Sequence, residues 1–171
     1  MPFIGLYMKA DMEGVTKVVF PEGTYWTLDV RQSAGDEVRE RITCSTQEEF
    51  EVPNSKSAKC NFMVKFEGAK APSTMSVVTL SRTSEIKDKA VTSAALGSYS
   101  ASGEMTPIAV FECRGLEPCK WYPVGPLQVE TEGGQVFEEV DLSDPDGWME
   151  ADEDGNCFSI GALEFEFKPV R

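Results

Sequence analysis

Short runs in which apolar and polar residues alternate place the strongest limit on what this chain can fold into. A period of two puts successive side chains on opposite faces of a strand, and Val, Ile, Phe, Tyr and Trp favour that backbone. Such runs recur throughout the sequence, whereas no segment has a convincing helical period; Ser84–Ala95 comes nearest. The expected strands are Phe3–Lys9, Val15–Phe20, Thr24–Val30, Cys60–Phe66, Thr74–Leu80, Ile108–Cys113, Gln135–Leu142 and Phe158–Lys168. We therefore predict an all-β fold.

A segment without this alternation divides the series in two. Residues 82–103 are rich in Ser, Thr, Ala and Gly, which is typical of a linker or mobile loop. A weak repeat spans it, with Ile4 placed against Ile108 and Met12 against Leu116. We predict an N-terminal β unit at 1–81, a linker or mobile loop at 82–103 and an acidic C-terminal β unit at 104–171. The two units would be similar, antiparallel and packed in tandem as in a sandwich.

Charge is distributed unevenly between these halves. The formal net charge is −13, and residues 105–171 hold 15 acidic and 4 basic side chains, against 14 and 12 in residues 1–104. An acidic surface repels phosphate backbones, so we expect no nucleic acid as a partner. A basic protein is the expected partner, because complementary fields speed encounter. An equally simple role for the acids is to keep the protein soluble.

Histidine is absent and the five cysteines are scattered. The first fact excludes Ser-His-Asp triads, Cys-His dyads and zinc sites built on imidazole. No C-x2-C pair occurs, so Cys44, Cys60, Cys113 and Cys119 form no recognisable zinc knuckle. We expect Cys113 and Cys157 to be buried as small hydrophobic residues. A soft-metal or redox pair at Cys113 and Cys119 is the alternative.

Two acidic stretches, Asp141–Gly147 and Asp152–Asn156, resemble calcium loops but do not complete the ligand pattern. Asx turns at strand ends explain them better. Glu138 and Glu139 are neighbours in a strand and point to opposite faces, so they cannot act together on one substrate. The aromatic residues fit a core at least as well as a ligand platform: Tyr25, Trp26, Trp121, Tyr122 and Trp148. We find no catalytic constellation.

The run Phe111-Glu-Cys113-Arg-Gly-Leu-Glu-Pro118 resembles the signature of the eukaryotic CXXC-motif-containing zinc-binding proteins. Similarity of pattern extends over most of the chain, including the Trp26 strand, Met63-Val64, the acidic Val140–Leu142 stretch before Trp148 and the closing Glu164–Lys168 strand. The resemblance implies two β units in tandem and one zinc ion held by two C-x2-C knuckles. By register those four ligand positions fall on Gln32, Gly35, Glu67 and Lys70, and none is a cysteine.

The resemblance therefore implies the fold while the residues argue against the metal. A structural zinc site contributes on the order of 10 kcal/mol to a module that is unfolded without it. An ion pair between Glu67 and Lys70 would be worth at most about 1 kcal/mol. We expect packing to replace the metal, with extra strands formed in residues 36–60 from Val38, Ile42, Phe50 and Val52.

These observations lead to a non-catalytic protein-binding or adaptor module with no cofactor, on a metal-free version of a zinc-binding fold. The alternative is a metal-handling protein that binds zinc or copper through unusual ligands such as Cys44 and Cys60. A third hypothesis is an enzyme that holds a small ligand with its tryptophans. We expect a monomer. We also expect no membrane contact, because no run approaches the ~20 apolar residues of a membrane helix. Met1–Lys9 is too short and polar for a signal peptide, so the expected compartments are the cytoplasm and the nucleus.

Overall fold

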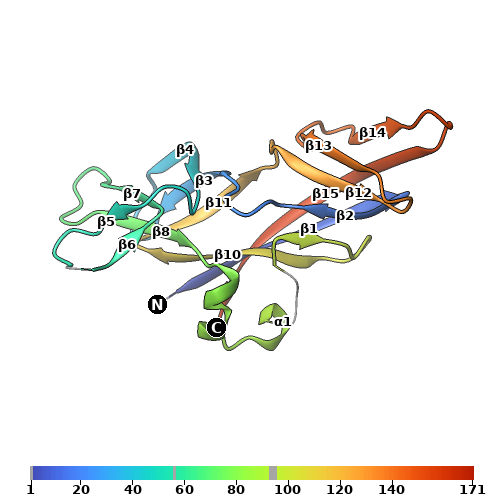
Figure 1. Cartoon of the computed structure of the whole chain (residues 1–171). Helices are drawn as coiled ribbons and strands as arrows, with labels where there is room; N and C mark the ends of the chain where they lie inside the picture. The colour runs from blue at the N-terminus through green and yellow to red at the C-terminus, as the bar shows by residue number, and fades with distance from the viewer. Residues whose placement is uncertain (1, 56, 93–95) are drawn as a thin grey trace.

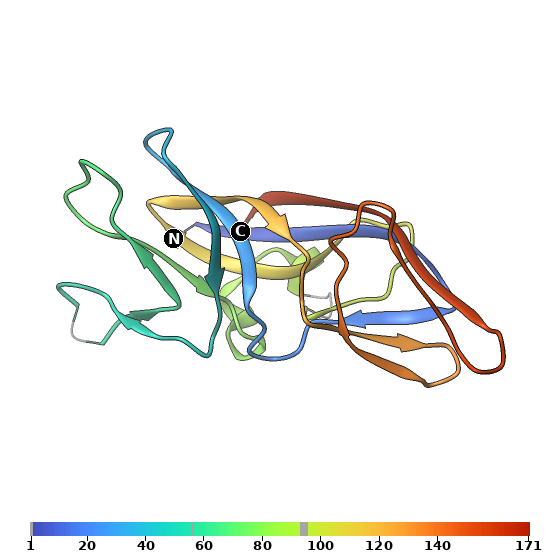
Figure 2. The ribbon, with the colours of Figure 1, turned by 90° about the horizontal axis from the view of Figure 1, so that it is seen from above.

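The computed structural model describes residues 2–55, 57–92 and 96–171, and its architecture is that of a β sandwich (Figures 1 and 2). One layer is a six-stranded sheet in the order β14-β15-β1-β10-β8-β7. Its strands are β1 (Phe3–Glu13), β7 (Phe62–Val64), β8 (Ser73–Val77), β10 (Thr106–Arg114), β14 (Trp148–Ala151) and β15 (Cys157–Val170). Every pairing is antiparallel. The all-β prediction is confirmed.

Two smaller sheets form the other layer. One has the order β11-β3-β4 and the other β13-β12-β2-β9. Their strands are β2 (Val15–Val19), β3 (Trp26–Gln32), β4 (Val38–Cys44), β9 (Ser98–Tyr99), β11 (Leu116–Tyr122), β12 (Leu127–Thr131) and β13 (Val136–Val140). β5 (Phe50–Glu51) and β6 (Lys59–Cys60) pair with each other to form a two-stranded antiparallel ribbon. Strands β4, β5 and β6 are the additional ones expected in residues 36–60.

Alternation along β1 divides the core between the two faces of the large sheet. Leu6, Met8 and Ala10 are buried against residues of both smaller sheets, including Trp26 and Val129. Phe3 and Tyr7 point the other way and pack on a second cluster formed by Val78, Ile86, Val91, Leu96, Val110 and Val170. Because both faces are covered, the central strands are apolar on both sides.

Two glycines move the chain from the large sheet into the small ones. Gly14 separates β1 from β2 and Gly115 separates β10 from β11, with φ of +69° and +76°. A side chain at Gly115 would come within 2.6 Å of Ser73 Oγ, so neither the backbone nor the space favours another residue. These turns define the internal repeat as strand, glycine, strand. Its register equates Val15 with Leu116, three residues away from the expected match of Met12 with Leu116.

Strands from both predicted units are interleaved. β2 pairs with β12, β3 pairs with β11, and β1 lies between β10 and β15. Each of the three larger sheets thus contains strands from 1–81 and from 104–171. Whether those ranges behave as separate domains stays a prediction.

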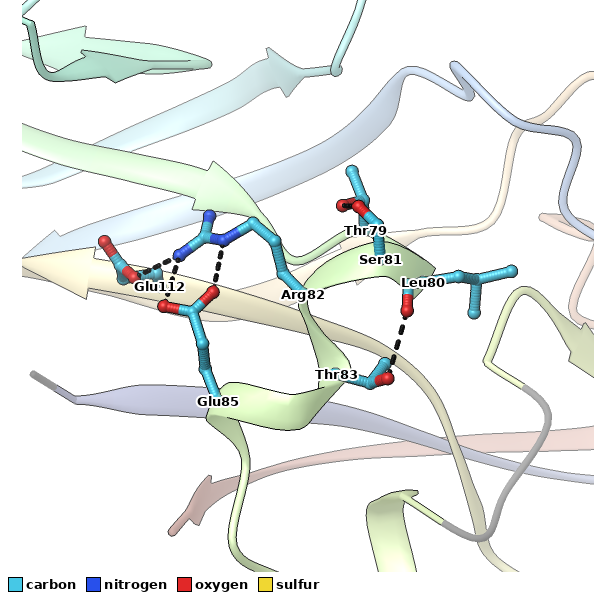
Figure 3. A network of polar contacts seen from close by, with 7 residues as sticks. All are labelled: Thr79, Leu80, Ser81, Arg82, Thr83, Glu85 and Glu112. Carbon is cyan, nitrogen blue, oxygen red and sulfur yellow. Dashed lines mark hydrogen bonds and ion pairs between the residues drawn. The ribbon is translucent and has the colours of Figure 1, made fainter.

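The segment expected to be a linker covers the outer face of the large sheet. It includes most of the 3-10 helix η1 (Leu80–Glu85), the helix α1 (Lys89–Thr92) and β9; residues 93–95 lie outside the described residues. Buried Ile86, Val91 and Leu96 attach it to Val110 and Val170. Arg82 fixes η1 to β10, since its Nη2 donates to Glu112 Oε2 at 2.7 Å while its Nε donates to Glu85 Oε2 at 2.6 Å (Figure 3). Neither of these helices has the length or apolarity to cross a bilayer, and the described residues form no other.

Tyr99 on β9 closes this segment onto β1. The pairing of β1 with β15 is irregular between Lys9 and Asp11, where Ala10 has no partner on β15. The buried Tyr99 hydroxyl accepts a hydrogen bond from Ala10 N at 3.0 Å, and it lies 2.7 Å from the carbonyl oxygen of Ala101 and 2.8 Å from that of Glu104. One phenol group therefore satisfies the irregular strand and orients the chain that follows β9.

Tyr99→Phe should lower the free energy of unfolding by about 1–3 kcal/mol, because the Ala10 N–H would remain buried without an acceptor. Urea denaturation measures the change. Tyr25→Phe is the matched control, since Tyr25 is 41% exposed and its hydroxyl remains accessible to water. Equal stabilities of the two variants would contradict the role given to Tyr99.

Candidate functional site

The four positions implied as zinc ligands lie in two loops that the fold brings together. Gln32 ends β3 and Gly35 lies in the turn before β4, while Glu67 and Lys70 belong to the connection between β7 and β8. Glu37 Oε1 accepts a hydrogen bond from Glu67 N at 3.1 Å, which joins the two loops directly. The fold thus places the four positions in two neighbouring loops.

Each loop is also closed on itself. Gly35 N donates to Gln32 O at 3.3 Å, and Ala69 N donates to Phe66 O at 3.1 Å. Gln32 N donates to Glu37 O at 2.9 Å, so the first loop returns to its starting point. These are tight turns of the kind in which a C-x2-C pair can direct both sulfur atoms at one ion.

A carboxylate, a guanidinium and an aromatic ring hold the loops where a metal would otherwise do so. Arg39 Nε donates to Glu37 Oε2 at 2.6 Å, and its guanidinium carbon lies 5.7 Å from the centroid of the Phe66 ring. Phe66 itself is buried. The pKa of Glu37 is lowered, first by the hydrogen bond from Arg39 and then by that from the Glu67 amide. We call Glu37, Arg39, Phe66 and the Glu67 amide the Glu37 clasp.

The side chains at the four positions do not fit zinc. Gly35 has no donor atom, and the ammonium group of Lys70 would repel a cation. Glu67 and Lys70 are exposed, and the ion pairs of the described residues do not include one between them. Across residues 2–55, 57–92 and 96–171, no three side chains of Cys, Asp or Glu are grouped so that they could hold a metal ion.

The cysteines divide into three buried and two exposed thiols. Cys44, Cys60 and Cys113 are buried, as expected for Cys113. Burial is the largest cause that raises the pKa of each, to about 12 for Cys113, so these thiols stay protonated at neutral pH and are weak ligands. Cys157 was expected in the core, and that prediction is wrong. It begins β15 beside the 152–156 turn and is exposed.

Cys119 does not share the environment of Cys113. It lies at an irregularity in the pairing of β11 with β3, where its thiol contacts Asp29 O at 3.5 Å. Asp29 is buried; its carboxylate accepts hydrogen bonds from Arg41 N and from the Tyr122 hydroxyl, both at 2.9 Å. This polar cluster pins β3 to both neighbours. Nothing in the sequence pattern distinguished Asp29 from the other acids.

The aromatic residues are mainly structural. Trp26 and Trp121 are buried with ring centroids 6.4 Å apart, and Trp148 packs against Phe137. A cavity of about 550 Å³ has Trp26 and Ile108 in its lining, but Glu22 is the one charged residue among the described residues around it. Neither this cavity nor a smaller one near β15 is lined by Trp121 or Trp148. The structure thus brings no convergent acids to the tryptophans.

The acidic stretches form Asx turns, as the sequence predicts. Oδ1 of Asp141, of Asp144 and of Asp152 each accepts a hydrogen bond from the amide two residues later, at 2.7–2.9 Å. Asp152 also binds the side chain of Asn156, which is the largest cause that lowers the pKa of Asp152. The loops thus use their carboxylates to hold their own backbone.

Acidic side chains are concentrated at one end of the molecule. Residues 127–160 contain 11 acidic residues and neither lysine nor arginine. They form β12, β13, β14 and the start of β15, at the right-hand end in Figure 1. Glu132, Glu138, Glu139, Glu153 and Asp154 are among the exposed ones. We call residues 127–160 the acidic end.

Comparison with known proteins agrees with the geometry of the two loops. The family model described as "CXXC motif containing zinc binding protein, eukaryotic" matches residues 5–168. The chain belongs to this family. In this chain Gln32, Gly35, Glu67 and Lys70 stand at the positions where the resemblance implies cysteines.

Relatives match over nearly their whole lengths. UPF0587 protein CG4646 of Drosophila melanogaster is 29% identical over 98% of this chain and 96% of its own. UPF0587 protein F46B6.12 of Caenorhabditis elegans is 24% identical over 100% and 97%. A hypothetical protein from Plasmodium falciparum has a TM-score of 0.82 at 27% identity, covering 98% of this chain and all of that one. The crystal structure of C1orf123 shares the fold, with a TM-score of 0.77 at 19% identity over 97% and 98%.

The Glu67 amide should report the charge of Glu37. Because the folded pKa of Glu37 is lowered, its stabilising contribution is present above the unfolded pKa and is lost as pH falls through the folded pKa. In an NMR titration the Glu67 amide resonance should move with a midpoint below 4.5, the ordinary value for this carboxyl. Glu37→Gln should abolish that transition. A midpoint at or above 4.5 would contradict the clasp.

Restoring the four cysteines should restore zinc binding, because the loops already face each other. The variant Gln32→Cys, Gly35→Cys, Glu67→Cys, Lys70→Cys should bind one zinc per chain by elemental analysis, and zinc should raise its Tm. A variant with only the first two changes is the control and should bind zinc far more weakly. A folded four-cysteine variant that binds no zinc would show that the ligand positions are misassigned.

Proposed function

We propose that this member of the family is a non-catalytic protein-binding module that works without a metal ion, and that the acidic end recognises a basic protein. The observation that carries the proposal is the continuous acidity of residues 127–160 on one end of an otherwise mixed surface. Charges of one sign gathered at one end produce a directed field, which raises the rate at which an oppositely charged partner arrives.

The loops of the acidic end support this role because they are held in shape without a ligand. Asx turns order the backbone around Asp144 and Asp152. Lys17 on β2 lies 3.2 Å from Glu130 on β12 and partly neutralises it. In the β12–β13 and β14–β15 turns, Glu132, Glu153 and Asp154 remain exposed. An ordered, unneutralised surface loses little entropy when it binds.

Direct binding of a basic probe tests the proposal. A fluorescent oligolysine peptide should bind the full chain at low ionic strength (about 0.02 M) and weaken steeply towards about 0.5 M, where charges are screened over a few ångströms. Reversing four acids of this end (Glu132→Lys, Glu138→Lys, Glu153→Lys, Asp154→Lys) should weaken binding at least about tenfold, the effect of roughly 1.4 kcal/mol.

The control reverses four exposed acids elsewhere, Glu22→Lys, Glu40→Lys, Glu48→Lys and Glu104→Lys, and so makes the same change in net charge. We expect it to retain most of the affinity. Equal losses in the two variants would mean that net charge alone attracts the peptide. Binding that does not respond to salt would overturn the proposal.

A further inference from the structure

The last strand of the large sheet has a long edge without a partner strand. β14 pairs with β15 only at Cys157–Ile160, whereas β1 pairs with β15 as far as Val170. In the part of the chain that the structure describes, Ala162–Lys168 therefore have a strand on one side only, and β15 forms the margin of the sheet in Figure 2. Pro169 lacks an N–H group and ends the usable edge.

Side chains along this edge alternate between two chemistries. One face of the strand carries Leu163, Phe165 and Phe167. The ring centroids of Phe165 and Trp121 are 6.2 Å apart, and Phe165 is 38% exposed. Glu164 and Glu166 share the opposite face and are exposed. Lys9 Nζ lies 3.9 Å from Glu164 Oε2 and Lys168 Nζ lies 3.7 Å from Glu166 Oε2, and each lysine side chain is about half buried. An added strand would meet an apolar row on one face and an acidic row on the other.

A cavity of about 180 Å³ adjoins the apolar row. Ile160, Leu163 and Phe165 of β15 form one side of it; Pro123, Leu142 and Pro145 form the other. A cavity of about 150 Å³ can hold a benzene ring, so this one has room for one side chain and is smaller than the ~300 Å³ of typical small-molecule pockets. Asp144 also lines it, which places a carboxylate beside the apolar space.

We propose that the β15 edge, residues 162–168, binds an extended basic segment of a partner protein as an additional antiparallel or parallel strand. Its apolar side chains would lie beside Phe165 and Phe167, with one entering the cavity; its Lys or Arg side chains would lie beside Glu164 and Glu166. Main-chain hydrogen bonds supply affinity in this mode, and alternate side chains supply specificity. The charge of the partner rests on the function proposed above, whereas the site and the alternation rest on β15.

Charge disfavours a second copy of this chain as the occupant. Pairing two β15 edges would bring together four glutamates and four lysines, counting Lys9 of β1, so the repulsion comes from the two acidic ends beside them. Like charges opposite each other on paired strands are destabilising. Inward and edge charges of this kind protect natural sheets from self-association, and here the same charges select a basic strand.

Two peptides of equal composition test the alternation. An eight-residue Lys-Val repeat should bind the full-length protein at least about tenfold more tightly than a peptide with four Lys followed by four Val, because only the first matches a period of two. In NMR spectra the repeat should shift and protect the amides of residues 162–168. N-methylation of alternate peptide amides should abolish the difference.

Two charge reversals of equal size locate the site. Glu164→Lys with Glu166→Lys should weaken the Lys-Val peptide about tenfold or more, while Glu40→Lys with Glu48→Lys, which are exposed and lie outside both β15 and the acidic end, should weaken it less than threefold. Thermal melting checks that both variants fold, and sedimentation at high concentration should show a monomer. Equal losses would mean that net charge alone attracts the Lys-Val peptide and would overturn the edge site, whereas the four-acid reversal of the acidic end tests the proposed function separately. A dimer broken by the first pair would make a second copy the occupant and overturn the proposal. If neither peptide nor oligolysine binds, both proposals fail.

Discussion

The pairing of β1 on both of its edges is the constraint on which the rest of the structure depends. β15 follows it from Phe3 to Glu13 and β10 from Phe3 to Met8. Its two faces meet different clusters, with Leu6 and Met8 buried on one and Tyr7 packed on the other. Full burial of one such apolar side chain is worth about 1.5–3 kcal/mol. Both smaller sheets and residues 80–92, 96 and 97 find their positions against this strand and its neighbours.

The Glu37 clasp joins the two loops through contacts between side chains and backbone of this chain. A zinc ion contributes on the order of 10 kcal/mol where a module cannot fold without it. Here the loops start from strands that are already secured, because Gln32 pairs with Leu116 and Val64 pairs with Ser73. The buried Phe66 anchors the second loop, and Glu37 needs only to fix its position relative to the first. Few polar contacts suffice because the paired strands already order the ends of both loops.

Prediction from sequence succeeded where the alternation within a single strand indicates which of its side chains are buried. The alternating runs at Phe3–Lys9 and Phe158–Lys168 lie in β1 and β15 of the large sheet, and Trp26 and Trp121 are core residues. The sequence only implied β11, through the repeat, because Pro118 interrupts its pattern. It did not predict β12, which spans only five residues. The 82–103 segment lacked a period because its anchors, Ile86, Val91 and Leu96, act singly. The roles of Asp29, Glu37 and Tyr99 depend on partners that lie 12 to 93 positions away along the chain. Local sequence patterns carry no record of such partners.

Interleaving of the strands has a consequence for how the protein is made. β1 leaves the ribosome before both of its neighbours, which lie about a hundred residues or more downstream. Non-local pairing of this kind is slow, and an apolar strand that waits for its partners is open to wrong ones. The nascent chain must therefore carry β1 without its partner strands until those residues have been made. A strand that is paired on both edges in the native state thus remains unpaired until β10 and β15 emerge.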